Sequence, residues 1–221
     1  MTEAPTPIDD DGAAEGNTLD QLIQVRRDKV TSLRERGIEP YASVWSPTHR
    51  LDQVIALWGK IEAGEETGAE ITIAGRLVAK RGQGKLAFGV LREAGTDLQL
   101  FVQINALGEQ GMAFFDEMDV GDWVGAVGEV IATRRGELSV RPRELTLLTK
   151  SLRPLPDKWH GLKDVEQRYR QRELDLVVNE DTRRTFEIRA KVLRALRDDL
   201  TGRGFIEVET PMLHPIPGGA T

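Results

Sequence analysis

Five runs of strand-like sequence fill the centre of the chain, and they limit its fold more than any other feature. Apolar and polar residues alternate, or β-branched residues cluster, in the ranges 71–79, 85–93, 97–104, 120–132 and 137–148. Short turns that contain glycine join the first three runs, and the turn TRRG joins the last two. Residues 108–119 are long enough for one or two helical turns. This pattern predicts one small all-β domain.

The order of these elements indicates which small domain this is. Three strands, a short helix and two strands are typical of a five-stranded oligonucleotide-binding (OB) barrel, although an SH3-like or other small barrel fits the pattern too. Glycines at 75, 89, 125 and 128 suit the coiling of such a barrel. An OB barrel binds its ligand across strands two and three and the loops beside them.

Alternation along the strands predicts which side chains reach that ligand face. Inward-facing positions are Leu98, Leu100, Val102 and Ile104 on the third strand and Leu138 and Val140 on the fifth. Outward-facing positions are Gln99, Phe101, Gln103, Glu137, Ser139 and Arg141. Gly89 leaves the direction of Phe88 open. We expect amides, a carboxylate and an aromatic ring to read single-stranded bases here, with Lys80, Arg81 and Lys85 at the rim for phosphates.

The segments before the strands differ from them in composition. Residues 1–16 carry five acidic residues and no basic one, which predicts a disordered acidic tail. Residues 17–70 are expected to hold a helix that ends near Gly37 and a linker with a shorter helix at 51–61. Basic residues cover much of the first helix, so it either follows a phosphate backbone or presents an ordinary solvated face.

Several classes of protein are disfavoured. The sequence has no apolar run long enough to span a membrane, no secretory signal and no cysteine, so a cytoplasmic protein is expected. The three histidines, His49, His160 and His214, are scattered and predict neither a metal site nor a catalytic triad.

Specific strings then point to a family. LRPLPDK, HGL, RYRQR, LDL, GFIEVETPM and IPGGA, with the earlier AGRL, GKLAF and GELSV, resemble the class II lysyl-tRNA synthetase family over residues 18–221. The resemblance implies an anticodon-binding OB domain at 71–149, a linker at 150–163 and the α/β start of a class II catalytic domain at 164–221. Residues 182–211 resemble the first of three signature motifs.

The same resemblance implies roles for individual residues. It implies that Arg81, Phe88, Gln99 and Glu137 recognise the anticodon. It also implies that the rim of the substrate pocket is formed by Gly218, Gly219 and Ala220. The homodimer interface is expected to include Phe186, Leu193, Leu196 and Pro211. Arg170 and Arg172 are expected to be structural ion-pair partners. Glu173 departs from the family, which usually has an aromatic residue there, and is expected either to form a local ion pair or to mark divergence.

The implied activity is attachment of lysine to its tRNA with ATP and Mg²⁺. The second and third signature motifs do not appear in these 221 residues, so we expect no catalytic residue, no bound cofactor and no ligase activity from this chain alone. Its expected partners are the lysine tRNA anticodon loop and a second subunit. Two alternatives are a short paralogue that only binds RNA or partners, and part of a fused enzyme with another activity.

Overall fold

The computed structural model describes residues 19–42, 44–156 and 162–212. The chain divides into two compact units, Met1–Leu155 and Pro156–Thr221, which are described separately below. In the described ranges, no helix is both long enough and apolar enough to cross a membrane.

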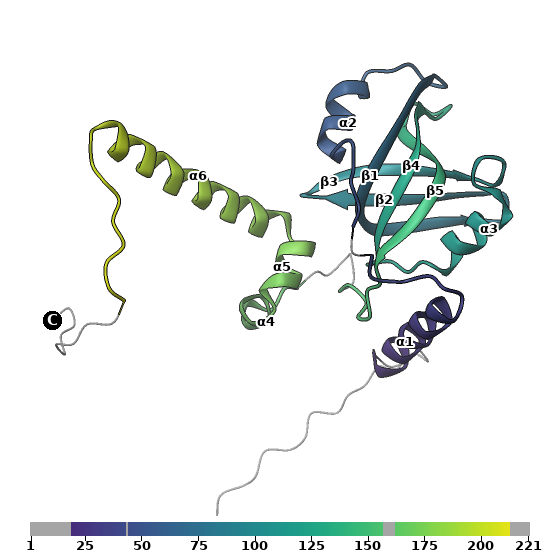
Figure 1. Ribbon diagram of the computed structural model, residues 1–221, viewed down its shortest axis with the longest axis horizontal. Coiled ribbons are helices and arrows are strands. Elements are labelled where there is room, and N and C mark those ends of the chain that lie inside the picture. The colour runs from purple at the N-terminus through teal and green to yellow at the C-terminus, as the bar shows by residue number, and fades with distance from the viewer. Residues whose placement is uncertain (1–18, 43, 157–161, 213–221) are drawn as a thin grey trace, which may run out of the picture. The chain divides into compact units, whose positions relative to one another are not determined.

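The first unit is built on a closed five-stranded barrel (Figure 1). Its strands are β1 (Glu66–Gln83), β2 (Leu86–Glu93), β3 (Thr96–Gln103), β4 (Trp123–Ala132) and β5 (Leu138–Thr149). They close in the order β1-β2-β3-β5-β4, in which only β3 and β5 pair in parallel. The expected five-stranded barrel, with a helix between its third and fourth strands, is therefore confirmed.

The intervening helix is α3 (Ile104–Glu117), and it is longer than the sequence suggested. Its backbone kinks at Gly108, whose φ of 78° is left-handed. Ile104 was expected to end the third strand, but it is the first residue of α3 and packs against the core from there.

The ring of Phe115 in α3 explains why Gly89 of β2, and not Phe88, points into the core. Phe115 is fully buried in the barrel core. A Cβ at Gly89 would lie 3.2 Å from Phe115 Cζ and 3.1 Å from Leu77 Cδ1, so the inner position can hold only glycine without a shift of its neighbours. Because neighbouring residues alternate, Phe88 faces outward.

Two helices precede the barrel. In α1 (Leu19–Glu35), Leu33 is buried, and the helix stops where expected. Gly37 has a φ of 76°, and Ile38 N–H donates to the Leu33 carbonyl, which is a left-handed helix stop that favours glycine. The shorter α2 (Leu51–Trp58) buries Leu51 and Val54 in the barrel core.

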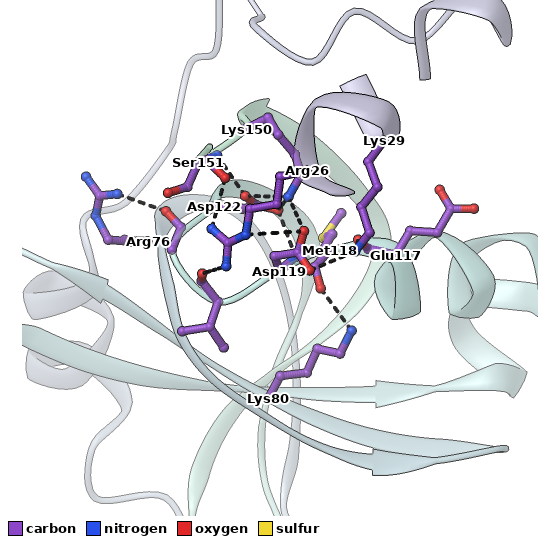
Figure 2. Close-up of polar contacts among 12 residues, drawn as sticks. Arg26, Lys29, Arg76, Lys80, Glu117, Met118, Asp119, Asp122, Lys150 and Ser151 are labelled. Atoms are coloured by element: carbon purple, nitrogen blue, oxygen red, sulfur yellow. Dashed lines mark hydrogen bonds and ion pairs between the residues drawn. The ribbon is translucent and has the colours of Figure 1, made fainter. Parts of the chain in front are cut away.

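A partly buried cluster of charges joins α1 to the barrel (Figure 2). We call Arg26, Lys29, Asp119, Asp122 and Lys150 the docking cluster. Lys150 is only 3% exposed, and its Nζ donates to Asp122 Oδ2 at 2.7 Å and to Asp119 Oδ2 at 2.6 Å. Lys29 Nζ donates to Asp119 Oδ1 at 2.7 Å, and Arg26 donates to the carbonyls of Ser151 and Val120. Two of the basic residues of α1 are thus directed toward the barrel.

The Lys80 side chain lies at the same end of the barrel as the docking cluster (Figure 2). Its Nζ donates to the carbonyls of Phe115, Asp116 and Met118 at 2.8–3.0 Å, and so satisfies the C-terminal end of α3. The expectation that Lys80 stands at the rim for phosphates is therefore wrong.

Acidification is expected to destabilise the first unit through Asp119. Burial by itself would raise the pKa of Asp119, but hydrogen bonds from Lys150 and Lys29 hold this pKa below its ordinary value. Because the folded pKa lies below the unfolded one, the stabilisation is present above about pH 4 and is lost as the pH falls through the folded value. Urea unfolding between roughly pH 5 and pH 2 should show a weaker pH dependence for Asp119→Asn than for the original chain. Equal pH dependence in the two proteins would contradict this assignment.

The second unit contains three helices, α4 (Val165–Arg170), α5 (Arg172–Val178) and α6 (Glu180–Gly202). The Asp164 side chain accepts from Gln167 N–H at 2.8 Å and begins α4. The fully buried Asp175 carboxylate accepts from Arg168, Asn179 and Thr182, and pairs with Arg172 at 2.5 Å. This carboxylate therefore holds all three helices together.

This unit settles three further expectations. The structural role of Arg170 and Arg172 is confirmed, because Arg170 pairs with Glu166 and Arg172 with Asp175. Glu173 is exposed and has no ion pair within the part of the chain that is described. Residues 205–209 were expected to form a short strand, but they form no β-ladder with any described segment, so this expectation is wrong.

Candidate nucleic-acid interface

The outer side of the barrel carries a groove of about 1270 Å³. It is larger than the roughly 300–1,000 Å³ of a typical small-molecule pocket, so it suits a more extended ligand. It runs over the faces of β2 and β3 and along the turn between β4 and β5. Its lining includes Arg81, Leu86, Phe88, Val90, Gln99, Phe101, Gln103, Arg134, Arg135, Glu137 and Arg141.

Two aromatic rings lie together in the groove. Phe88 of β2 pairs in register with Phe101 of β3, and their ring centroids are 5.4 Å apart with the planes tilted by 51°. The guanidinium carbon of Arg81 lies 5.2 Å from the centre of the Phe88 ring. Outward-facing rings of this kind form a stacking surface for bases.

The amide of Gln99 is oriented by its neighbours beside these rings. Its Oε1 accepts from Arg81 Nη2 at 3.3 Å, and its Nε2 donates to Ser139 Oγ at 2.9 Å. Gln99 is 8% exposed, although it faces the groove and not the core. An amide nitrogen has two protons and an amide oxygen two lone pairs, so one donor and one acceptor position remain for a ligand.

Glu137 reaches the groove from the turn between β4 and β5. Thr133 N–H donates to the Glu137 carbonyl at 2.9 Å, and Glu137 N–H donates to Thr133 Oγ1 at 3.1 Å. Gly136 takes a φ of 82°, and its N–H donates to the Thr133 carbonyl at 2.8 Å, which closes the turn. The Glu137 carboxylate is exposed and has no partner among the described residues, so it can accept a hydrogen bond.

Arg141 also lines the groove, but its charge is compensated. It pairs with Glu66 at 2.6 Å and with Glu129 at 2.6 Å. The hydrogen bonds that Arg141 donates to these two carboxylates, Glu66 foremost, raise the pKa of Arg141 above its ordinary value. This guanidinium therefore contributes to the wall of the groove and offers little net charge.

The structure brings some of the expected residues together and not others. Arg81, Phe88, Gln99 and Glu137 all line the one groove. Lys85 is exposed on the β1–β2 turn but does not line it. Gly218, Gly219 and Ala220 lie outside the described residues. Sequence reasoning missed the two arginines of the TRRG turn, although a basic pair in a loop beside the binding face was a usable signal.

Comparison with known proteins agrees with this geometry. Residues 71–148 match the family model described as OB-fold nucleic acid binding domain, and residues 164–221 match that of tRNA synthetases class II (D, K and N). The lysine–tRNA ligase of Bacillus subtilis is 47% identical over 205 residues, which are 92% of this chain and 41% of that protein. The chain is homologous to lysine–tRNA ligases. The resemblance first seen in the short strings is thereby confirmed.

Other relatives give the same result. The lysine–tRNA ligase of Moorella thermoacetica is 48% identical over 199 residues, and that of Oceanobacillus iheyensis is 46% identical over 205 residues. The chain spans about two fifths of the length of these lysine–tRNA ligases, because it covers 40% and 42% of them. Within that span lie an OB domain and the start of a class II catalytic domain.

Proposed function

We propose that this chain is part of a lysine–tRNA ligase and that its barrel binds the anticodon loop of lysine tRNA in the groove. One observation carries the proposal. Arg81, Phe88, Gln99 and Glu137 come from β1, β2, β3 and the β4–β5 turn, yet they line the same groove. Homology to lysine–tRNA ligases over 92% of the chain supports the choice of RNA.

The polar groups of the groove suit a uridine-rich triplet. A uracil edge presents one N–H between two carbonyl oxygens. Glu137 offers an acceptor for the N–H, while Arg81 and Gln99 offer donors for the carbonyls. Phe88 supplies the stacking surface beneath the base. Together these groups would read the anticodon by both shape and hydrogen bonding.

The chemistry of lysine activation is proposed for the whole ligase. ATP would supply the leaving group for activation, and Mg²⁺ would bind its phosphates. No group of three or more potential metal ligands exists in the described ranges.

A second subunit is proposed to cover the apolar side of α6. Phe186, Leu193 and Leu196 lie along this helix and are 41–55% exposed. Pro211, in the segment that follows α6, is also exposed and is proposed to belong to the same interface.

Removing the stacking surface is expected to weaken RNA binding. Stacking of a base on an aromatic ring contributes about 1–3 kcal/mol, so Phe88→Ala should raise the Kd for a uridine-triplet RNA hairpin roughly 5- to 150-fold. A filter-binding titration measures this. Tyr41→Ala is the matched control, because Tyr41 is an exposed aromatic residue that does not line the groove. An unchanged Kd for Phe88→Ala, with thermal unfolding also unchanged, would remove Phe88 from the site.

A further inference from the structure

The groove contains four arginines, and the structure separates them into two classes. Arg81 lies over the Phe88 ring and donates to Gln99, and Arg141 is paired with two carboxylates. Lys80, expected from sequence to reach phosphates, is held by the carbonyls at the end of α3. These three cations are held by groups of the protein and have little freedom to follow an RNA backbone.

Arg134 and Arg135 form the other class. Both are exposed, both line the groove, and neither has a side-chain partner among the residues that the structure describes. Their positive charges are therefore uncompensated at the rim. An uncompensated pair of arginines beside a stacking surface attracts the phosphates of a single strand.

The backbone beneath this pair is well held. Besides the hydrogen bonds between Thr133 and Glu137, Ala132 N–H donates to the Glu65 carbonyl at 2.9 Å and Gly64 N–H donates to the Thr133 carbonyl at 3.1 Å. The turn is thus tied to the segment before β1. Because Glu137 belongs to the same turn, a base bound at Glu137 brings its own backbone close to the two arginines.

We infer that Arg134 and Arg135 bind RNA phosphates next to the anticodon and position the strand without reading its sequence. This inference rests on the proposed function, since it takes the groove as the place where the bases bind. The residues of the groove would then have two different roles. Phe88, Gln99 and Glu137 contact bases, while the turn supplies the salt-dependent part of the affinity.

The test is a salt titration of the 221-residue chain. Each phosphate contact to a single strand contributes about 0.7 to the slope of log affinity against log salt, so Arg134→Gln/Arg135→Gln should flatten the slope by roughly 1.4. At about 0.1 M salt this corresponds to a roughly 25-fold weaker Kd. The loss should be equal for a hairpin with a uridine triplet and one with an adenosine triplet. Arg134→Lys/Arg135→Lys keeps the charges and should restore the slope.

Arg143→Gln is the matched control, because Arg143 is an exposed arginine of β5 that pairs with Glu70 and does not line the groove. Its salt slope should equal that of the original chain. An unchanged slope in the Arg134→Gln/Arg135→Gln variant would overturn this inference and leave the proposed function standing. A changed ratio between the two hairpins would also overturn it. If the original chain binds neither hairpin, both the inference and the proposed function fail.

Discussion

Replacing Lys150 by methionine is expected to destabilise the first unit by roughly 3–5 kcal/mol. Lys150 Nζ is the cation that both Asp122 oxygens accept from, and Asp122 is fully buried. Asp122 would keep hydrogen bonds from the backbone N–H groups of Asp119 and Ser151, but it would lose its hydrogen-bonded cation and keep only the longer-range attraction of cations such as Arg76. Removing one partner of a buried pair costs far more than the pair contributes, because the remaining charge stays out of water.

Urea unfolding followed by tryptophan fluorescence measures this effect. Trp45, Trp58 and Trp123 all lie in the Met1–Leu155 unit and report its unfolding. Arg143→Met serves as the control, because the Arg143–Glu70 pair is exposed and should contribute less than about 1 kcal/mol.

A double substitution separates charge from packing. Lys150→Met combined with Asp122→Asn removes both buried charges and keeps a side-chain acceptor for the backbone N–H groups of Asp119 and Ser151, so it should recover part of the stability that Lys150→Met loses. If Lys150→Met alone unfolds within about 1 kcal/mol of the original chain, the docking cluster does not stabilise the unit as argued.

Replacing Leu193 and Leu196 by glutamate is expected to weaken self-association roughly 100- to 1000-fold. Both leucines lie on the apolar side of α6, with exposed fractions of 41% and 55%. Covering about 400 Å² of apolar surface gains on the order of 10 kcal/mol before ordering and association costs. A residue central to an interface contributes about 2 kcal/mol or more, so two buried glutamates should remove most of the net affinity.

Sedimentation velocity over a range of concentrations tests this prediction. Lys191→Glu/Arg194→Glu is the matched control, since these exposed residues have the same spacing but lie on the opposite side of a helix with 3.6 residues per turn. The control should associate like the original chain, although it changes the net charge more. A strictly monomeric original chain with strong amide protection throughout 182–211 would contradict the proposed interface.

Local patterns predicted much of the barrel and of the helix ends. Alternation placed Gln99 and Phe101 outside and Leu100 inside, because side chains on a strand change face at every residue. Gly37 indicated a helix end from its own chemistry. The four groove residues were assigned by resemblance to a family, and the structure places them in one groove without testing their roles.

The direction of Phe88 and the availability of each cation needed the tertiary structure. Phe88 faces outward because Phe115, far along the chain, occupies the space inside Gly89. Lys80 is bound by carbonyls 35–38 residues away, and Arg141 by a carboxylate 75 residues away. The sequence by itself determined where positive charges occur. Only folding decided which of them are neutralised, because a charge is compensated by the groups that surround it in space and not by its neighbours in the chain.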